Sequence, residues 1–317
     1  MGRESLIFKQ DECKSRDVIL HSVQNVPFYE VFMSAIVLRE SVASDEQLVD
    51  LWVHGKSKTT IRYYRSEAVR FLGFVGKSLS LVSLSDLQGF ADELDNLGLQ
   101  VSSQSRSLSV IKSLLAFGHK IGVLPFNVGA VLEMPKVKDK LSERILSESE
   151  VHSMIALESN PRNKLILKLL YGAGLRVSEL CSLKWCDVKS SGESGQVTVF
   201  GKGGKTRAVL LPVSLYRDIQ GLRGDRSHDD SLFMSRKNHG HLDPSMVMRI
   251  VRAAAARVGI EQNVSPHWLR HCHASHSLDR GAPITLVQST LGHSNIATTS
   301  KYLHARPNDS SARYLAV

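Results

Sequence analysis

Apolar residues recur at three- and four-residue spacing between residue 44 and about residue 120. This spacing places the apolar side chains on one face of a helix and predicts amphipathic helices packed around a common core. One such face consists of Ile61, Tyr64, Ala68, Phe71 and Val75. Ser44, and Ser83 or Ser85, stand where helix N-caps are expected. The pattern therefore predicts a compact all-helical domain over residues 44–133.

The pattern changes at residue 134. Residues 134–146 are highly charged, contain a proline near their start and show no amphipathic period, which predicts an exposed linker. Helical spacing resumes at Ser147, so residues 147–317 are predicted to form a second domain. Residues 1–43 have too weak a periodicity to assign elements and are predicted to be an N-terminal extension.

The composition of β-strands appears in two short runs of the second domain. Residues 196–200 and 207–213 flank a glycine- and lysine-rich segment, 201–206, and predict a β-hairpin. The predicted fold class is mainly α with a small antiparallel β-sheet, so that an all-helical first domain is followed by an α+β second domain.

Composition excludes several classes of protein. The chain has 317 residues, of which 42% are hydrophobic and 22% charged, without a low-complexity tract, which excludes a fibrous or wholly disordered protein. Its apolar runs are far shorter than the ~20 residues that span a bilayer, and the N-terminus lacks a secretory pattern. The four cysteines form no C-x-x-C pair. We therefore expect a cytoplasmic protein with reduced thiols and no membrane partner.

Net charge gives a first functional indication. Forty Lys and Arg residues against 31 Asp and Glu residues give a formal charge of +9. A positive field favours polyanionic partners such as DNA or RNA, although a basic soluble enzyme of another kind has the same balance.

The predicted helices, hairpin and turns of the second domain do not explain why six of its polar residues stand where they do. They are Arg176 at a glycine-rich bend, Lys202 at the hairpin tip, His267 and Arg270 three apart on one helix, His293 after a glycine, and Tyr302 nine residues later. Arginines bind phosphate oxygens, histidines transfer protons and a tyrosine can act as a nucleophile. The sequence has neither an acidic cluster suited to magnesium nor a Walker-type loop. We therefore expect neither a metal nor another cofactor.

In this order and at this spacing, these segments resemble the catalytic domain of the tyrosine site-specific recombinases, also called the phage integrase family. They are most similar to the short two-domain bacterial members that resolve chromosome dimers. The resemblance covers about residues 45–305. It implies that residues 44–133 are a DNA core-binding domain and residues 147–317 the catalytic domain. The implied function is site-specific cleavage and rejoining of DNA strands through a covalent 3′-phosphotyrosyl intermediate, in integration, excision or dimer resolution.

The resemblance also implies roles for the six residues. Tyr302 is the nucleophile, and Arg176 and Arg270, with His293, stabilise the charge that develops on the phosphate oxygens. Lys202 protonates the departing 5′-oxygen.

The remaining predicted site residues support these groups. His267 helps to move the tyrosine proton, Glu179 supports the first arginine, and His271 supports the site from behind. Either Lys205 or Arg207 is an alternative to the hairpin lysine as the acid.

The implied partner is double-stranded DNA with a specific recombination site, bound by a homo-tetramer on paired sites. A partner recombinase or an accessory protein is left open. A basic helix in the first domain and a second-domain helix that resembles the family's major-groove helix supply most of the predicted DNA contacts. These contacts are Lys56, Lys58, Arg62, Arg65, Lys205, Arg207, Arg249 and Arg252. Residues 310–317 are predicted to form a short helix that links protomers.

Several alternatives stand beside this interpretation. Tyr171 and Tyr314 are rival nucleophiles, although Tyr171 lies in an apolar stretch and Tyr314 has no histidine nine residues before it. The histidines His267, His271, His273 and His276 suggest a zinc site. This site is disfavoured because the pair His267 and His271 and the pair Cys272 and His276 point to different sides of the helix, and no acidic third ligand is suitably spaced. The alternative functions are a type IB topoisomerase-like relaxing enzyme and a catalytically silent DNA-binding protein.

Overall fold

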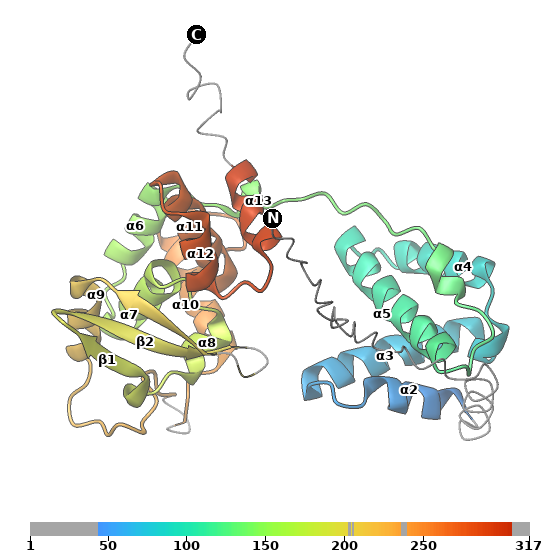
Figure 1. Cartoon of the computed structure of the whole chain (residues 1–317). Coiled ribbons are helices and arrows are strands. Elements are labelled where there is room, and N and C mark those ends of the chain that lie inside the picture. Colours follow the sequence, from blue (N-terminus) through green and yellow to red (C-terminus); the bar gives the residue numbers. More distant parts are fainter. Residues whose placement is uncertain (1–43, 202–203, 205, 236–239, 306–317) are drawn as a thin grey trace, which may run out of the picture. The chain divides into compact units, whose positions relative to one another are not determined.

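The computed structural model describes residues 44–201, 204, 206–235 and 240–305. The chain divides into two compact units, Met1–Lys138 and Asp139–Val317 (Figure 1). Each unit has its own buried apolar core. The predicted extension over residues 1–43 lies outside the described residues. The mainly helical fold class with a small antiparallel sheet is confirmed.

The described part of the first unit is all helical, as predicted. Its elements are α2 (Asp45–Val53), α3 (Lys58–Val75), η1 (Leu79–Leu81), α4 (Leu84–Asn96), α5 (Val101–Lys120) and η2 (Val128–Val131). Serine N-caps fix the starts of α2, α3 and α4, because Ser44, Ser57 and Ser83 each accept a backbone N–H of the first turn. Phe71 of α3 packs edge-on against Phe90 of α4, with ring centroids 5.1 Å apart, and this contact lies in the core of the unit.

The second unit combines helices with one small sheet. Its elements are η3 (Ser142–Arg144), α6 (Glu148–Ala156), α7 (Pro161–Gly172), α8 (Val177–Ser182), η4 (Trp185–Asp187), β1 (Val188–Ser191), β2 (Ser194–Phe200), β3 (Thr206–Leu211), α9 (Val213–Gln220), α10 (Pro244–Arg257), α11 (Pro266–Asp279), α12 (Ile284–Leu291) and α13 (Ile296–Ala305). Within the described parts of both units, no helix combines the length and apolarity needed to cross a membrane.

The sheet is antiparallel with the order β1-β2-β3. Phe200 pairs with Thr206, so β2 and β3 form the predicted hairpin. Alternate residues of β2 and β3 are buried, and β2 packs against α9. The predicted second strand extended to residue 213, but β3 ends at Leu211 because Pro212 supplies no N–H and precedes α9. Strand β1 was not predicted, because it is short and its residues are mostly polar and exposed.

The predicted linker over 134–146 is shorter in the structure. Ile145 and Leu146 are each only 6% exposed and belong to the core of the second unit. The backbone N–H of Leu146 donates to Cys272 Sγ at 3.3 Å, and its carbonyl accepts from His276 Nε2 at 3.0 Å. An apolar pair at the end of a charged stretch therefore anchors the chain on α11.

Helix α11 organises the second unit. It packs against α7, α12 and α13 (Figure 1). Cys272 and His276 contact the anchored chain at Leu146, whereas His271 points to α13 and contacts Tyr302. The same helix thus contributes to the core and to the predicted site.

Candidate active site

The N-terminus of α8 positions the first predicted arginine. Arg176 is the N-cap residue, and its backbone N–H donates to Glu179 Oε2 at 2.8 Å. Its guanidinium donates to Glu179 Oε1 at 2.7 Å and to the carbonyl of Gly292 at 3.4 Å. Gly174 allows the chain to turn into α8 because its φ is +59°, a conformation that favours glycine. The Arg176 side chain is 35% exposed, so it is accessible to an anion.

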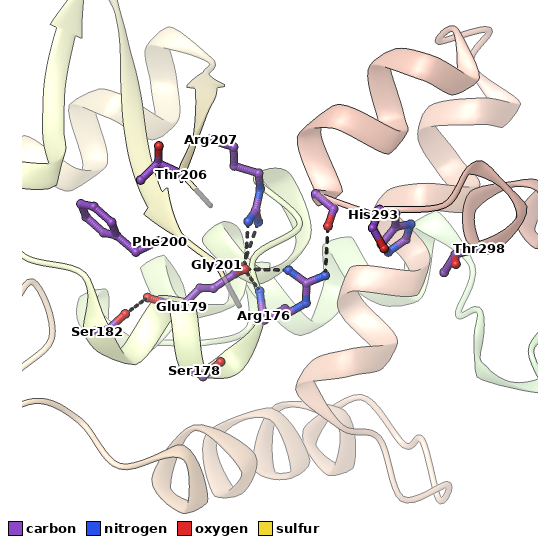
Figure 2. Close-up of a pocket in the computed structure, with 12 residues that line it drawn as sticks. Arg176, Ser178, Glu179, Ser182, Phe200, Gly201, Thr206, Arg207, His293 and Thr298 are labelled. Atoms are coloured by element: carbon purple, nitrogen blue, oxygen red, sulfur yellow. Dashed lines mark hydrogen bonds and ion pairs between the residues drawn. The ribbon is translucent and has the colours of Figure 1, made fainter. Parts of the chain in front are cut away.

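A second arginine shares the same carboxylate. Arg207 of β3 donates to both oxygens of Glu179, at 2.8 and 2.9 Å, and to the carbonyl of Thr290 at 2.7 Å. Figure 2 shows Arg176 and Arg207 converging on Glu179. Only 13% of the Arg207 side chain is exposed. The guanidinium is paired with Glu179 inside the protein, and the contact of Arg207 with DNA stays a prediction.

The carboxylate between these arginines is strongly acidic. Burial raises the pKa of Glu179, but hydrogen bonds from Arg207 and Arg176 outweigh it and lower the pKa to about 2. Glu179 therefore stays ionised at neutral pH and holds β3 to the start of α8.

Arg270, the second predicted arginine, lies on α11 and is only 1% exposed. Its guanidinium donates to the carbonyls of Gly174 and Leu291, which precede α8 and end α12. Burial, with the nearby positive charge of Arg176, lowers its pKa to about 10, so it remains protonated at neutral pH. Arg270 therefore joins the two segments that carry Arg176 and His293.

His293 follows the left-handed glycine that ends α12. Gly292 has φ +65° and the backbone N–H of His293 donates to the carbonyl of Gln288 at 3.1 Å. The imidazole Nδ1 is hydrogen bonded to Thr299 Oγ1 of α13 at 2.9 Å, and Thr299 is fully buried. Burial and the positive charge of Arg270 lower the pKa of His293 to about 4, so its ring is neutral at pH 7.

Tyr302 lies on α13 and is 5% exposed. Its hydroxyl is hydrogen bonded to Nδ1 of His271 at 2.8 Å. The rings of His271 and His267, one turn apart on α11, have centroids 4.6 Å apart. Burial raises the pKa of Tyr302, and burial followed by the charge of His267 lowers the pKa of His271 to about 4. The tyrosine and His271 therefore form a neutral pair.

A pocket of about 960 Å³ lies beside these groups. Its lining includes the Arg176–Glu179–Arg207 cluster on one side and His293 and Thr298 on the other (Figure 2). Phe200 and Thr206, the ends of the hairpin strands, also line it. The pocket thus offers cationic and neutral hydrogen-bond donors to an anionic group. The ends of strands β2 and β3 form part of its wall.

The structure describes most of the predicted site residues. Lys202 and Lys205 lie outside the described residues, as does the rival Tyr314. The other rival, Tyr171, has its hydroxyl hydrogen bonded to Nδ1 of buried His276 at 3.0 Å. Among the described residues, no three His, Cys, Asp or Glu side chains gather as a metal-binding group.

The predicted DNA-contact residues of the two units are mostly at the surface. In the first unit Lys58 and Arg62 are exposed, whereas exposed Arg65 pairs with Asp50 at 2.9 Å and Lys56 Nζ lies 5.6 Å from the centroid of the Tyr64 ring. In the second unit, Arg249 and Arg252 are exposed on α10.

Sequence reasoning missed the parts that lie far apart along the chain. Arg207 is 28 residues from Glu179 in sequence, and a basic residue after a turn is typical of a solvated surface. Thr299 is an ordinary helical residue whose contact with His293 depends on the packing of α13. Glu179, three positions after Arg176, was assigned through the family resemblance, which implies an acidic residue at that position.

The sequence matches the phage integrase family over residues 144–309, and its N-terminal SAM-like domain over residues 46–120. The chain is 34% identical to the tyrosine recombinase XerA of Pyrococcus horikoshii over 271 residues. This alignment covers 83% of this chain and 90% of that protein. It is 33% identical to the tyrosine recombinase XerD of Oceanobacillus iheyensis, covering 79% and 89%.

Solved structures share the fold. A XerH site-specific recombinase bound to its difH substrate matches with a TM-score of 0.65 and 21% identity, covering 92% of this chain and 89% of that chain. A lambda integrase dimer bound to a COC′ core site matches with a TM-score of 0.68 and 19% identity, covering 84% and 95%.

Proposed function

This chain belongs to the phage integrase family, and on that premise we propose that it recombines DNA at specific sites with Tyr302 as the nucleophile. The chain is a tyrosine recombinase, an enzyme that cleaves and rejoins DNA strands through a covalent intermediate. The observation that supports Tyr302 is its position: the hydroxyl lies on α13 and contacts His271, beside the arginine that joins α8 and α12.

The chemistry that we propose is transesterification. The Tyr302 oxygen attacks the scissile phosphorus, a 3′-phosphotyrosyl bond forms, and the bond from phosphorus to the 5′-oxygen breaks. The new phosphodiester replaces the old one, so rejoining needs no nucleotide. By resemblance to the family, Lys202 gives a proton to the departing 5′-oxygen.

The arginines supply the charge that this step requires. Arg176 presents its partly exposed guanidinium to the pocket, and the buried Arg270 contributes positive charge from behind it. His293 is neutral and can donate a hydrogen bond to a phosphate oxygen. Groups held in place in this way stabilise charge that develops in the transition state without reorganising.

The assembly follows from the reaction. Exchange between two duplexes requires four strand cleavages, so we propose a homo-tetramer on paired DNA sites in the cytoplasm, with a partner recombinase or accessory protein as an added requirement to be tested. The first unit is proposed to bind DNA through exposed Lys58 and Arg62, and the second through Arg249 and Arg252 on α10.

Covalent trapping on genomic fragments, followed by sequencing of the trapped DNA, tests this function. Wild-type protein is expected to yield adducts at a defined sequence, and Tyr302→Phe is expected to yield none while it binds the same DNA within about twofold, because only one hydroxyl is lost. Relaxation of plasmid DNA without a preferred sequence would favour the topoisomerase alternative. An adduct from the Tyr302→Phe variant would place the nucleophile at another tyrosine.

A further inference from the structure

The nucleophile contacts one of the two histidines that α11 directs toward the site. The hydroxyl of Tyr302 lies 2.8 Å from Nδ1 of His271. His267 lies one turn earlier, is exposed, and has its ring 4.6 Å from that of His271. Among the described hydrogen bonds, the bond to His271 is the one made by the Tyr302 hydroxyl.

The position of His271 is fixed by its neighbour in the chain. Arg270 is buried and donates to the carbonyls of Gly174 and Leu291. These bonds fix α11 against the segment before α8 and the last residue of α12. His271 is therefore held in a fixed position against α13, the helix that carries Tyr302. A group that exchanges a proton with a reacting atom needs such a fixed position.

We propose, on the basis of the proposed function, that His271 rather than His267 accepts the Tyr302 proton during cleavage and returns it during rejoining. In this step the ring proton of neutral His271 is on Nε2, and the Tyr302 hydroxyl donates to Nδ1. As the tyrosine oxygen bonds to phosphorus, its proton moves to Nδ1 and gives an imidazolium. The bond to the 5′-oxygen breaks, and a separate acid protonates that oxygen.

In the free protein, the surroundings of His271 keep its imidazole neutral, as a general base requires. Burial is the largest cause that lowers the pKa of His271, to about 4. Positive or titratable groups that face its ring lower this pKa further: His267 and Arg270 on α11, Arg144 on η3 and His293 after α12. The ring is therefore neutral at pH 7 and able to accept a proton. A bound phosphodiester brings negative charge beside these cations and raises the basicity of the imidazole.

The decisive variant is His271→Asn. An asparagine side chain can accept the tyrosine hydrogen bond but has no basic nitrogen, so it keeps the contact and removes the proton acceptor. We measure single-turnover cleavage of a nicked suicide duplex that carries the site recovered by covalent trapping. Loss of general-base catalysis is expected to slow cleavage by about 10²- to 10⁴-fold without changing DNA binding.

A modified substrate separates base from acid catalysis. A sulfur atom in place of the bridging 5′-oxygen departs without protonation, so it rescues a variant that lacks the general acid. His271→Asn is expected to remain slow on this substrate, because its defect concerns the nucleophile. His271→Gly is expected to recover in part when imidazole is added to the solution.

The matched control is His273→Asn on the same helix. Its Nδ1 is hydrogen bonded to the carbonyl of Tyr171 on α7, and we expect cleavage close to the wild-type rate. The proposal is overturned if His271→Asn cleaves at the wild-type rate, if it cleaves faster than wild type, or if His267→Asn instead carries the defect that imidazole relieves. None of these outcomes affects the tyrosine assignment, which fails only if Tyr302→Phe still forms the adduct.

Discussion

At the scale of single residues, Glu179 controls the geometry of the anion-binding side of the site. It binds Arg176 of α8 and Arg207 of β3 at once, with three side-chain nitrogens within 2.9 Å of its oxygens. Its pKa of about 2 follows from these bonds outweighing burial. The family resemblance implied the contact of Glu179 with Arg176, three residues earlier. The contact with Arg207 depends on how the sheet packs, which no local sequence pattern shows.

Arg207→Gln tests this control. The variant removes three hydrogen bonds and leaves buried Glu179 with a single arginine. We expect the free energy of unfolding to fall by about 2 kcal/mol and cleavage to slow. Arg207→Lys is expected to restore only part of the stability, because an ammonium cannot bind both carboxylate oxygens as a guanidinium does.

Arg217→Gln, at an exposed position of α9, is the control for lost charge. Urea denaturation gives the free energies, and single-turnover cleavage gives the rates. Equal stability of the Arg207→Gln variant and wild type would show that the cluster does not hold β3 to α8.

At the scale of elements, the sequence predicted helices and strands from periodic patterns, but it did not predict the backbone conformation that individual residues adopt. Serine caps and apolar stripes predicted the helices of the first unit, and two β-rich runs around a glycine-rich turn predicted the β2–β3 hairpin. The sequence could not show why Gly174 must be glycine. Its left-handed φ and its close neighbours arise from the packing of the α7–α8 connection against α11 and α12.

Gly174→Ala is expected to damage the site and the fold together. A Cβ atom at this position would lie 2.8 Å from side-chain carbons of His273 and Leu291, and the residue has φ +59°. The left-handed conformation alone costs about 1 kcal/mol, and the clash adds to it. Because the Gly174 carbonyl accepts from Arg270, cleavage should also slow.

Gly192→Ala isolates the two causes. Gly192 has nearly the same φ, +62°, but a Cβ atom there would have no neighbour within 4 Å. Thermal unfolding should therefore show about 1 kcal/mol of loss for Gly192→Ala and a clearly larger loss for Gly174→Ala. Equal losses in the two variants would mean that the neighbours of Gly174 move aside freely.

At the scale of the whole molecule, each unit has a separate core, and the strand exchange that we propose requires several copies of the chain. The segment proposed to link them, residues 310–317, lies outside the described residues. The sequence predicts it from apolar Tyr314, Leu315 and Val317, and a helix this short orders only against another surface.

Deletion of residues 308–317 tests this link. We expect binding to a single site to stay within about twofold of the full-length protein, and paired-site complexes and strand exchange to fall by about tenfold or more. Gel mobility on one-site and two-site DNA measures both. A truncated chain that recombines at the full-length rate would place the contacts between protomers on other surfaces, such as the helical first unit.

The way in which Arg270 is held has a consequence for how this enzyme can diverge. Its guanidinium is fixed by the main-chain carbonyls of Gly174 and Leu291, and every amino acid supplies such a carbonyl. Natural selection at these contacts therefore acts on the path of the backbone more than on the side chain at position 291. Substitutions that preserve this path leave the arginine in place, so lineages can accumulate extensive sequence drift around a chemically constant centre.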